Sequence, residues 1–299
     1  MTNYLTRKDS LKMIFVAFLW ALCFPLIKLG LASGTSPIFF GALRALIAAV
    51  ALFVLARIRG ESLSRIKVHW RLLVAIGVTA FLGFAGMFLG GASLNPGIAS
   101  VIGNSNPIMA SILAVWFLSE KLTAAKSLGL ILGFMGVILI SIPAFSNQTN
   151  SSLYGIGYVL LGALSAGAGS VLLKKVSLTD FSIITLFFQF ALAAILLFLV
   201  SFAVEGVPKI NLNFKFIMPL MVLAVGTTAY ADVLWIDLLK RNSISKLSIF
   251  MFLTPAFSII MGIVFFNESF GVWEITGILT IVSAIFLNIM SPPKVIHAP

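Results

Sequence analysis

Two long stretches of this chain contain no charged residue, and they constrain its fold more than any other feature. Residues 72–119 and 127–173 lack Asp, Glu, Lys and Arg. Each stretch is long enough for two helices of about 20 residues, the length that crosses a bilayer. Only 10% of the 299 residues are charged, whereas a soluble domain carries about 25%. The sequence therefore predicts a polytopic membrane protein.

Hydropathy divides the chain into ten apolar spans that are separated by short turn-like segments rich in Gly, Pro, Ser and Asn. We expect an all-α integral membrane fold with ten transmembrane helices. The expected spans are residues 11–32, 37–57, 71–92, 97–118, 124–143, 153–173, 180–203, 216–238, 246–266 and 271–290.

The second half of the sequence repeats a pattern of the first half. Residues 106–140 align with a segment that lies 148 positions later, and Arg44 to Ala49 aligns with Gln189 to Ala194. The identities in the longer match include a Pro, a Glu and a Gly, which are costly inside apolar helices. We therefore expect two five-helix repeats, residues 1–146 and residues 147–299. The matched pairs are Pro107/Pro255, Ile112/Ile260, Phe117/Phe265, Glu120/Glu268, Gly129/Gly277 and Leu139/Leu287.

Five helices per repeat mean that the second repeat enters the membrane from the opposite side, so the repeats are inverted. Inverted repeats in transporters surround a binding site near the bilayer midplane. On this topology, 16 of the 20 Lys and Arg residues fall on one side and two on the other. Because cytoplasmic loops are rich in Lys and Arg, both termini are predicted to be cytoplasmic. The pattern fits the inner membrane of a bacterium.

Several classes of function are disfavoured by composition. The net charge of +11 follows from membrane orientation, so we expect no nucleic-acid partner. Cys23 is the only cysteine, and His69 and His297 are the only histidines, so we expect no metal site and no cofactor. The sequence has no Gly-rich phosphate loop and no nucleophile with a nearby base, so we expect neither an enzyme nor any catalytic residue.

Short motifs in the two halves occur in one order along nearly the whole chain. Those of the first half are Trp20, Phe24 and Lys28 at four-residue steps, Arg44, and Pro107 leading to Glu120, Lys121, Leu122 and Thr123. Those of the second half are Leu234 and Trp235 before Leu239, Lys240 and Arg241, then Pro255, Glu268 and Gly277. With these motifs the chain resembles the EamA-type branch of the drug/metabolite transporter superfamily. The resemblance implies a ten-helix carrier of small organic molecules, commonly an exporter of amino acids or related metabolites.

Asp232 is the strongest candidate for a functional residue because it lies well inside the eighth span. A carboxylate there costs about 2.5–3.5 kcal/mol on insertion scales. Thr228, Asp232 and Trp235 are spaced i, i+4 and i+7, so they share one helix face. That face suits an amine or a zwitterion. Alternatively, Asp232 could carry a proton, or could pair with Lys28 or Arg44 only to neutralise buried charge.

The first two spans supply further candidates. Trp20, Phe24 and Lys28 form one slowly drifting stripe, and the resemblance implies that the first helix of each half lines the central cavity. Lys28 could meet a substrate carboxylate or the Asp232 charge, or could extend to the interface. Arg44 lies about two turns inside its span, and the resemblance favours a structural charge, with Gln189 at the equivalent position.

The fourth and ninth spans each contain a helix-breaking proline. Pro107 and Pro255 remove backbone hydrogen bonds, and loosened helices of this kind occur at transporter binding sites. We expect the two prolines to act as hinges, with Asn104 and Phe252 as substrate contacts. Asn104 and Asn106 are two positions apart, so they cannot both face one cavity.

Three acidic residues are expected near the membrane surfaces. Glu120 and Glu268, at the ends of the fourth and ninth spans, are expected to cap the helix that follows each of them. Asp237 is expected to be an interfacial charge that is balanced by Lys240 and Arg241.

Taken together, these features favour a monomeric carrier that moves a small metabolite by alternating access, with membrane lipid and a small-molecule substrate as partners. An amino-acid or amine-type exporter is the leading interpretation, and protons are a candidate coupling ion through Asp232. A carrier of a nucleoside-derived or vitamin-like metabolite, such as S-adenosylmethionine or riboflavin, is the alternative, since 27 Phe, 5 Trp and 4 Tyr could stack a ring. A non-transporting membrane partner protein needs no polar residues in its centre, so Lys28, Arg44 and Asp232 weigh against it.

Overall fold

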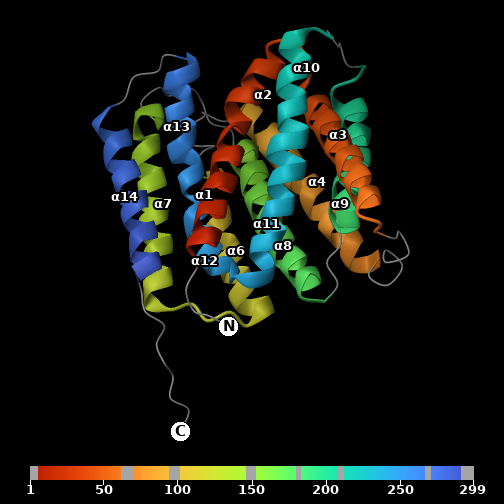
Figure 1. Cartoon of the computed structure of the whole chain (residues 1–299). Helices are drawn as coiled ribbons and strands as arrows, with labels where there is room; N and C mark the ends of the chain where they lie inside the picture. The colour runs from red at the N-terminus through yellow and green to blue at the C-terminus, as the bar shows by residue number, and fades with distance from the viewer. Residues whose placement is uncertain are drawn as a thin grey trace.

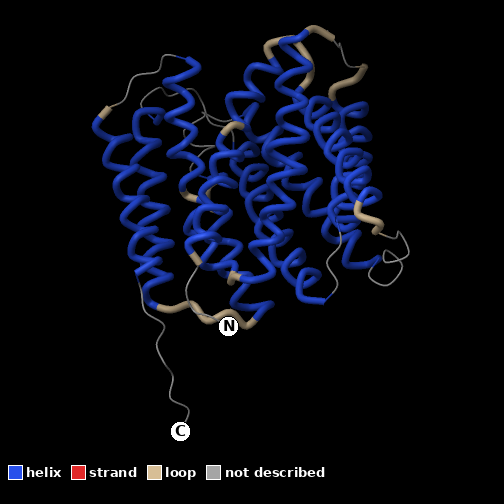
Figure 2. Tube along the Cα trace, viewed as in Figure 1, coloured by secondary structure: helices blue, strands red, loops and turns tan. Residues whose placement is uncertain are grey.

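The structure is a computed structural model that describes residues 6–61, 70–93, 102–145, 153–179, 183–207, 212–266 and 271–290. Every regular element in these ranges is a helix, and the helices stand side by side in one bundle (Figures 1 and 2). Nine of the helical segments in these ranges are long and apolar enough to cross a membrane, and a shorter apolar helix joins them. The prediction of an all-α membrane fold is confirmed.

The helices follow the predicted spans closely. The first half contains α1 (Arg7–Ala21), α2 (Cys23–Leu31), α3 (Pro37–Ile58), α4 (Trp70–Ser93), α6 (Asn106–Leu118) and α7 (Ala124–Phe145). The second half contains α8 (Leu153–Thr179), α9 (Ile183–Val204), α10 (Phe214–Met221), η2 (Val222–Tyr230), α11 (Ala231–Arg241), α12 (Ile244–Met251), α13 (Leu253–Phe266) and α14 (Val272–Met290). The expected boundary between residues 146 and 147 lies outside the described residues.

Helices α7 and α14 pack together through small residues at two matched points. A Cβ atom added to Gly277 would lie 2.6 Å from the carbonyl oxygen of Gly136, and one added to Gly129 would lie 3.5 Å from that of Ala284. At the 148-residue spacing of the repeat, Gly129 corresponds to Gly277 and Gly136 to Ala284. The two contacts are therefore equivalent, as expected of halves related by a two-fold axis.

Helices α3 and α9 are tied together at both ends by reciprocal caps. Glu205, just after α9, accepts hydrogen bonds from the backbone N–H groups of Ile38 and Phe39 at 2.8 and 3.0 Å. Glu61, just after α3, accepts one from the N–H of Ile184 at 3.2 Å. Each carboxylate satisfies donors at the N-terminus of the other helix, where negative charge is favourable. These caps hold α3 and α9 in register.

The first span is interrupted, whereas hydropathy predicts one helix over residues 11–32. Helix α1 ends at Ala21 and α2 begins at Cys23. Pro25 explains the break, because it has no N–H group and its ring excludes the carbonyl four residues earlier. That carbonyl belongs to Ala21, and it accepts a hydrogen bond from Ser258 Oγ of α13 at 3.3 Å. The break is thus stabilised from the other half of the chain.

The eighth span is also irregular. Pro219 lies inside α10, and the segment that follows it, η2, is a π-helix of nine residues. The hydroxyl groups of Thr227 and Thr228 both donate to the carbonyl of Leu223, each at 2.9 Å. The wider turn thus directs two consecutive threonines to one side, and π-helical turns of this kind often mark functional sites.

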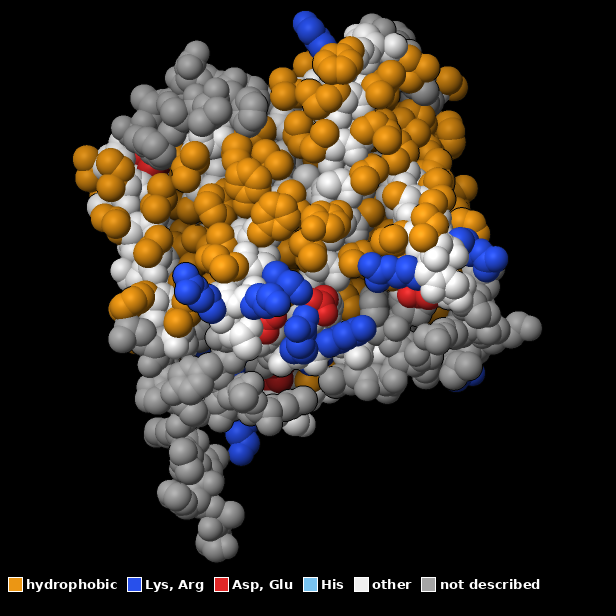
Figure 3. Space-filling view, in the orientation of Figure 1, with side chains coloured by type: hydrophobic (Ala, Val, Ile, Leu, Met, Phe, Trp, Pro, Cys, Tyr) orange, Lys and Arg blue, Asp and Glu red, His pale blue; other side chains and the backbone are white. Residues whose placement is uncertain are grey.

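The surface has the distribution expected of a multi-pass membrane protein. Figure 3 shows a broad hydrophobic face with Lys and Arg gathered along one border. Large apolar side chains are widely exposed, including Trp116 at 74%. At the end of the bundle where α11 ends, Asp237 pairs with Lys12 at 2.7 Å and with Arg241. The prediction that Arg241 balances Asp237 is confirmed, and Lys12 of α1 is an additional partner.

Glu120 caps a different helix from the one expected. Its carboxylate accepts hydrogen bonds from the N–H groups of Ile244 and Ser245 at 2.7 and 3.2 Å, and from Ser245 Oγ at 2.8 Å. These donors lie at the start of α12 in the second half, so the prediction that Glu120 caps α7 is wrong. Because the N-terminus of α12 lies beside the end of α6, its N–H groups reach the Glu120 carboxylate. Glu268 lies outside the described residues.

Candidate functional site

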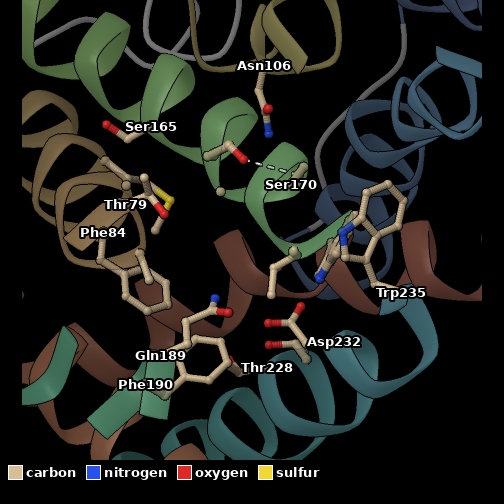
Figure 4. Close-up of a pocket in the computed structure, with 18 of the residues that line it drawn as sticks. Thr79, Phe84, Asn106, Ser165, Ser170, Gln189, Phe190, Thr228, Asp232 and Trp235 are labelled. Atoms are coloured by element: carbon tan, nitrogen blue, oxygen red, sulfur yellow. Dashed lines mark hydrogen bonds between the residues drawn. The ribbon is translucent and has the colours of Figure 1, made fainter. Parts of the chain in front are cut away.

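A cavity of about 300 Å³ lies between the two halves of the bundle. Its walls come from α1, α3, α4 and α6 of the first half, and from α8, α9, η2, α11 and α12 of the second (Figure 4). The break between α1 and α2 and the π-helix η2 both adjoin it. The elements that depart from regular helix are therefore gathered around the cavity.

Arg44 of α3 lines the cavity and is only 4% exposed. Its Nε donates to Thr228 Oγ1 at 2.8 Å, and its Nη2 donates to Thr227 Oγ1 at 3.4 Å and to Cys23 Sγ at 3.3 Å. The guanidinium also lies 5.1 Å from the centre of the Phe84 ring, a favourable cation–π distance. These contacts fix Arg44 in place, as a structural charge requires. Its Nη1 has no hydrogen-bond partner among the described residues.

Asp232 lies in the first turn of α11, and its carboxylate is directed into the cavity (Figure 4). No residue in the described part of the chain forms a hydrogen bond or an ion pair with it. Arg44 faces the same cavity, but its Nε and Nη2 donate to the two threonines and Cys23. The side chain of Lys28 lies outside the described residues. The cavity thus presents a carboxylate that is not neutralised by direct pairing with Arg44.

Aromatic rings form part of the cavity wall. Trp20 of α1 and Trp235 of α11 meet edge to face, with ring centroids 5.5 Å apart. Phe84 of α4 and Phe190 of α9 lie across from each other at 6.3 Å. The candidates Trp20, Thr228, Asp232 and Trp235 are therefore brought together at one site. The side chain of Phe24 lies outside the described residues.

Two side-chain amides complete the polar lining. Gln189 Oε1 and Asn106 Oδ1 are buried and have no hydrogen-bond partner among the described residues. In Figure 4, Gln189 lies on the same side of the cavity as Thr228 and Asp232, and Asn106 lies on the opposite side. From the sequence, Gln189 is predicted only as the equivalent of Arg44 and not as a substrate contact. The alignment of the repeats was the signal that could have identified it.

Two of the expected substrate contacts lie elsewhere. Asn104 is in the turn before α6 and does not line the cavity, whereas Asn106, the first residue of α6, does. Phe252 is fully buried between α12 and α13, and its ring occupies the space beside Gly133 of α7. Its neighbour Met251 lines the cavity instead.

The two prolines expected as hinges sit beside the cavity and do not line it. Pro107 is the second residue of α6, directly after the lining residue Asn106. Pro255 is the third residue of α13, just after the break at Phe252. Both helices therefore begin near the site, which is the geometry that a hinge requires.

The chemical groups of the cavity suit binding of a small polar molecule. They comprise one carboxylate, one guanidinium, two amides and several aromatic rings. The described residues include no group of three His, Cys, Asp or Glu side chains that could hold a metal ion. The groups that line the cavity offer charge, hydrogen bonds and ring contacts to a ligand.

Comparison with known proteins points to one family. The profile of the EamA-like transporter family matches residues 9–142 and again residues 153–290. The uncharacterised transporter YoaV of Bacillus subtilis is 28% identical, over 94% of this chain and 96% of its own length. A protein of Salmonella typhimurium named "probable amino-acid metabolite efflux pump" is 26% identical, over 95% of this chain and 96% of its own. A crystal structure with a TM-score of 0.81 covers 94% of this chain and 96% of its own at 16% identity, which shows a shared fold.

Proposed function

The chain belongs to the EamA-like transporter family, and we propose that it is a secondary transporter that moves a small organic metabolite across the cytoplasmic membrane by alternating access. The substrate class that we propose is an amino acid or an amine, moved out of the cell. One observation carries this proposal: the carboxylate of Asp232, which has no hydrogen-bond or ion-pair partner among the described residues, faces a cavity inside the helical bundle.

Charge is the first argument for an amine or a zwitterion. An unpaired carboxylate at membrane depth is costly, and a substrate ammonium group beside Asp232 would offset that cost. Trp20 and Trp235 add ring faces that attract a cation. Arg44 Nη1 offers a donor for a substrate carboxylate. The relative named as an amino-acid metabolite efflux pump agrees with this substrate class.

The alternating-access part of the proposal rests on the arrangement of the two halves. Residues 1–146 and 147–299 would act as inverted repeats around the cavity, with Pro107 and Pro255 as hinges. The paired contacts of α7 with α14 and the reciprocal caps of α3 and α9 support a two-fold relation between the halves. The breaks before α6 and between α12 and α13 give each half a place to bend.

We further propose a monomer in the inner membrane of a bacterium, with both termini in the cytoplasm. The gathering of Lys and Arg along one border of the molecule supports this orientation (Figure 3). Asp232 is also the candidate carrier of a coupling proton. Transport that responds to an imposed pH gradient in wild type and not in Asp232→Asn would support proton coupling, and pH-independent wild-type transport would contradict it.

A nucleoside-derived or vitamin-like substrate is the second candidate. The observation that favours it is the pair of aromatic contacts, Trp20 with Trp235 and Phe84 with Phe190, which could stack a heterocyclic ring. The carboxylate of Asp232 in the cavity ranks this second candidate below an amine or an amino acid. A non-transporting membrane partner protein would have no use for these polar groups in its centre.

A thermal-shift screen of the purified protein in detergent tests the substrate class. The panel comprises amino acids, polyamines, nucleoside derivatives and vitamins, and Asp232→Asn is measured beside wild type. We expect an amino acid or amine to raise the melting temperature of wild type and not of the mutant. Stabilisation by riboflavin or S-adenosylmethionine alone would favour the second candidate. Equal stabilisation of both proteins would make Asp232 structural.

A further inference from the structure

The side-chain amides of Gln189 and Asn106 line the cavity, and each has a buried oxygen without a hydrogen-bond partner among the described residues. Gln189 is 9% exposed, and its Oε1 has no partner among the described residues; the same is true of Asn106 Oδ1. Leaving a buried acceptor without a partner is unfavourable, and an apolar side chain of the same shape would avoid the penalty. Both atoms face the space in which the proposed function places the substrate.

We propose that Gln189 and Asn106 determine substrate specificity, and that the substrate carries a hydrogen-bonding group at each end. Gln189 receives a hydrogen bond from the amino group that meets Asp232. Asn106 pairs with a second polar group, such as an amide or a hydroxyl, at the far end of the molecule. This inference rests on the proposed function, and it adds the chemistry of the substrate's far end.

The position of Gln189 supports its role at the amino end. It belongs to α9, at the place equivalent to Arg44 in α3, and these two helices are locked together by the caps of Glu61 and Glu205. Figure 4 shows its amide on the side of the cavity where Thr228 and Asp232 lie. A neutral acceptor beside a carboxylate adds a directional contact for an ammonium group, which has three N–H donors.

Asn106 is suited to the far end. It is the first residue of α6, and its amide is directed from the opposite side into the cavity (Figure 4). Pro107 follows it and fixes the backbone at the start of the helix. The amide is therefore held at one side of the site and does not depend on a flexible loop.

Four of the five hydroxyl groups in the cavity lining, all except that of Ser165, already donate a hydrogen bond to a backbone carbonyl. Thr79 Oγ1 donates to the carbonyl of Ile76 at 2.8 Å, and Ser170 Oγ donates to that of Ala166 at 3.1 Å. Thr228 Oγ1 donates to a backbone carbonyl and accepts from Arg44. The two amides, Arg44 Nη1, Asp232 and the hydroxyl of Ser165 therefore have hydrogen-bonding capacity left for a substrate, and the acceptors of the two amides are buried without a partner among the described residues. A substrate whose far end is apolar would leave the Asn106 amide buried without a partner.

Matched pairs of compounds test this proposal. Asparagine and leucine differ mainly in an amide against an isopropyl group of similar shape, as do 3-aminopropanamide and 3-methylbutylamine. Uptake of each into proteoliposomes gives its half-saturating concentration. We expect wild type to prefer the amide-bearing member of at least one pair by about tenfold or more, because a site with buried polar groups rejects an apolar analogue.

The variants separate the two ends of the site. Asn106→Leu should reduce the preference for the amide-bearing compound to about twofold or less, or reverse it, because the amide that pairs with the far end of the substrate is lost. Asn106→Ala serves the same purpose if the larger side chain prevents folding. Gln189→Met should raise the half-saturating concentrations of both members of a pair by a similar factor, since both compounds carry the same amino group. Ser248→Ala, which changes a buried hydroxyl outside the cavity lining, should leave the preference unchanged.

Each outcome bears on one claim. An unchanged preference in folded Asn106→Leu or Asn106→Ala overturns the specificity role, as does wild type that prefers the apolar members. The proposed function survives both results if Asp232→Asn still abolishes uptake. If folded wild-type protein transports none of the four compounds, the amine or amino-acid class is itself wrong and this inference fails with it.

Discussion

Arg44 and Asp232 face the same cavity with opposite charges and do not form an ion pair. The guanidinium is held instead by Thr228, Thr227 and Cys23, and it lies over the ring of Phe84. A direct pair would neutralise the site and leave little reason for a charged substrate to enter. Keeping the two charges apart leaves both available, and the π-helix η2 makes this possible by presenting two threonines to Arg44.

Thr228→Val tests whether the threonine keeps Arg44 away from Asp232. The change preserves the shape of the side chain and removes the acceptor of Arg44 Nε. Loss of one charged hydrogen bond is worth about 1.5–3 kcal/mol, so we expect a lower melting temperature. We also expect the half-saturating concentration for transport to rise by roughly fivefold or more, because Arg44 is then free to pair with Asp232.

The control for this prediction is Thr280→Val. Thr280 of α14 is half-buried and lies outside the cavity lining, and its hydroxyl donates to the carbonyl of Thr276 at 2.8 Å. The same chemical change there should leave transport unaltered. If Thr228→Val transports with the same half-saturating concentration as wild type, the hydrogen bond from Arg44 to Thr228 is not needed for substrate binding.

Gly277→Ala should destabilise the contact between the two halves. The added Cβ would lie 2.6 Å from the carbonyl oxygen of Gly136, so α7 and α14 would have to move apart. Overpacking of this kind typically costs about 1–3 kcal/mol. Gly157→Ala is the matched control, because a Cβ there meets nothing within 4 Å. Thermal unfolding in detergent gives the melting temperature of each variant. Equal melting temperatures of Gly277→Ala and Gly157→Ala would contradict the close packing of α7 and α14.

Glu205→Ala should destabilise the junction of α3 and α9. The carboxylate accepts hydrogen bonds from Ile38, Phe39 and Ser201, and loss of a helix cap costs about 0.5–2 kcal/mol. Glu205→Gln keeps one oxygen acceptor and should therefore lose less stability. Melting temperatures in the order wild type, Gln, Ala would support the cap. The reverse order of the two variants would not be compatible with it.

The bundle could be predicted from the sequence because its main signal is local. An apolar run of about 20 residues marks a membrane helix wherever it occurs, and the predicted spans lie close to the observed helices. The shared face of Thr228, Asp232 and Trp235 also needed only helical spacing, and all three line the cavity.

The remaining features depend on partners that are distant in the sequence. Ser258 Oγ donates to Ala21 as well as to its neighbour Thr254, and the helix that Glu120 caps begins at Ile244. The contacts with Ala21 and Ile244 do not follow from neighbouring residues. The choice between Asn104 and Asn106 depends on the residue at which α6 begins, and helix ends are the least predictable feature of a sequence. The π-helix likewise has only a weak local signal, the nearby Pro219.

The central claim is that Asp232 binds the transported substrate, and uptake into proteoliposomes measures it most directly. Wild type would be compared with Asp232→Asn and with Asp237→Asn. The last variant changes a carboxylate on the same helix that pairs with Lys12 and Arg241 outside the cavity lining. The account predicts amine or amino-acid uptake by wild type and Asp237→Asn, and loss of about tenfold or more in Asp232→Asn. Equal uptake by all three proteins would contradict it.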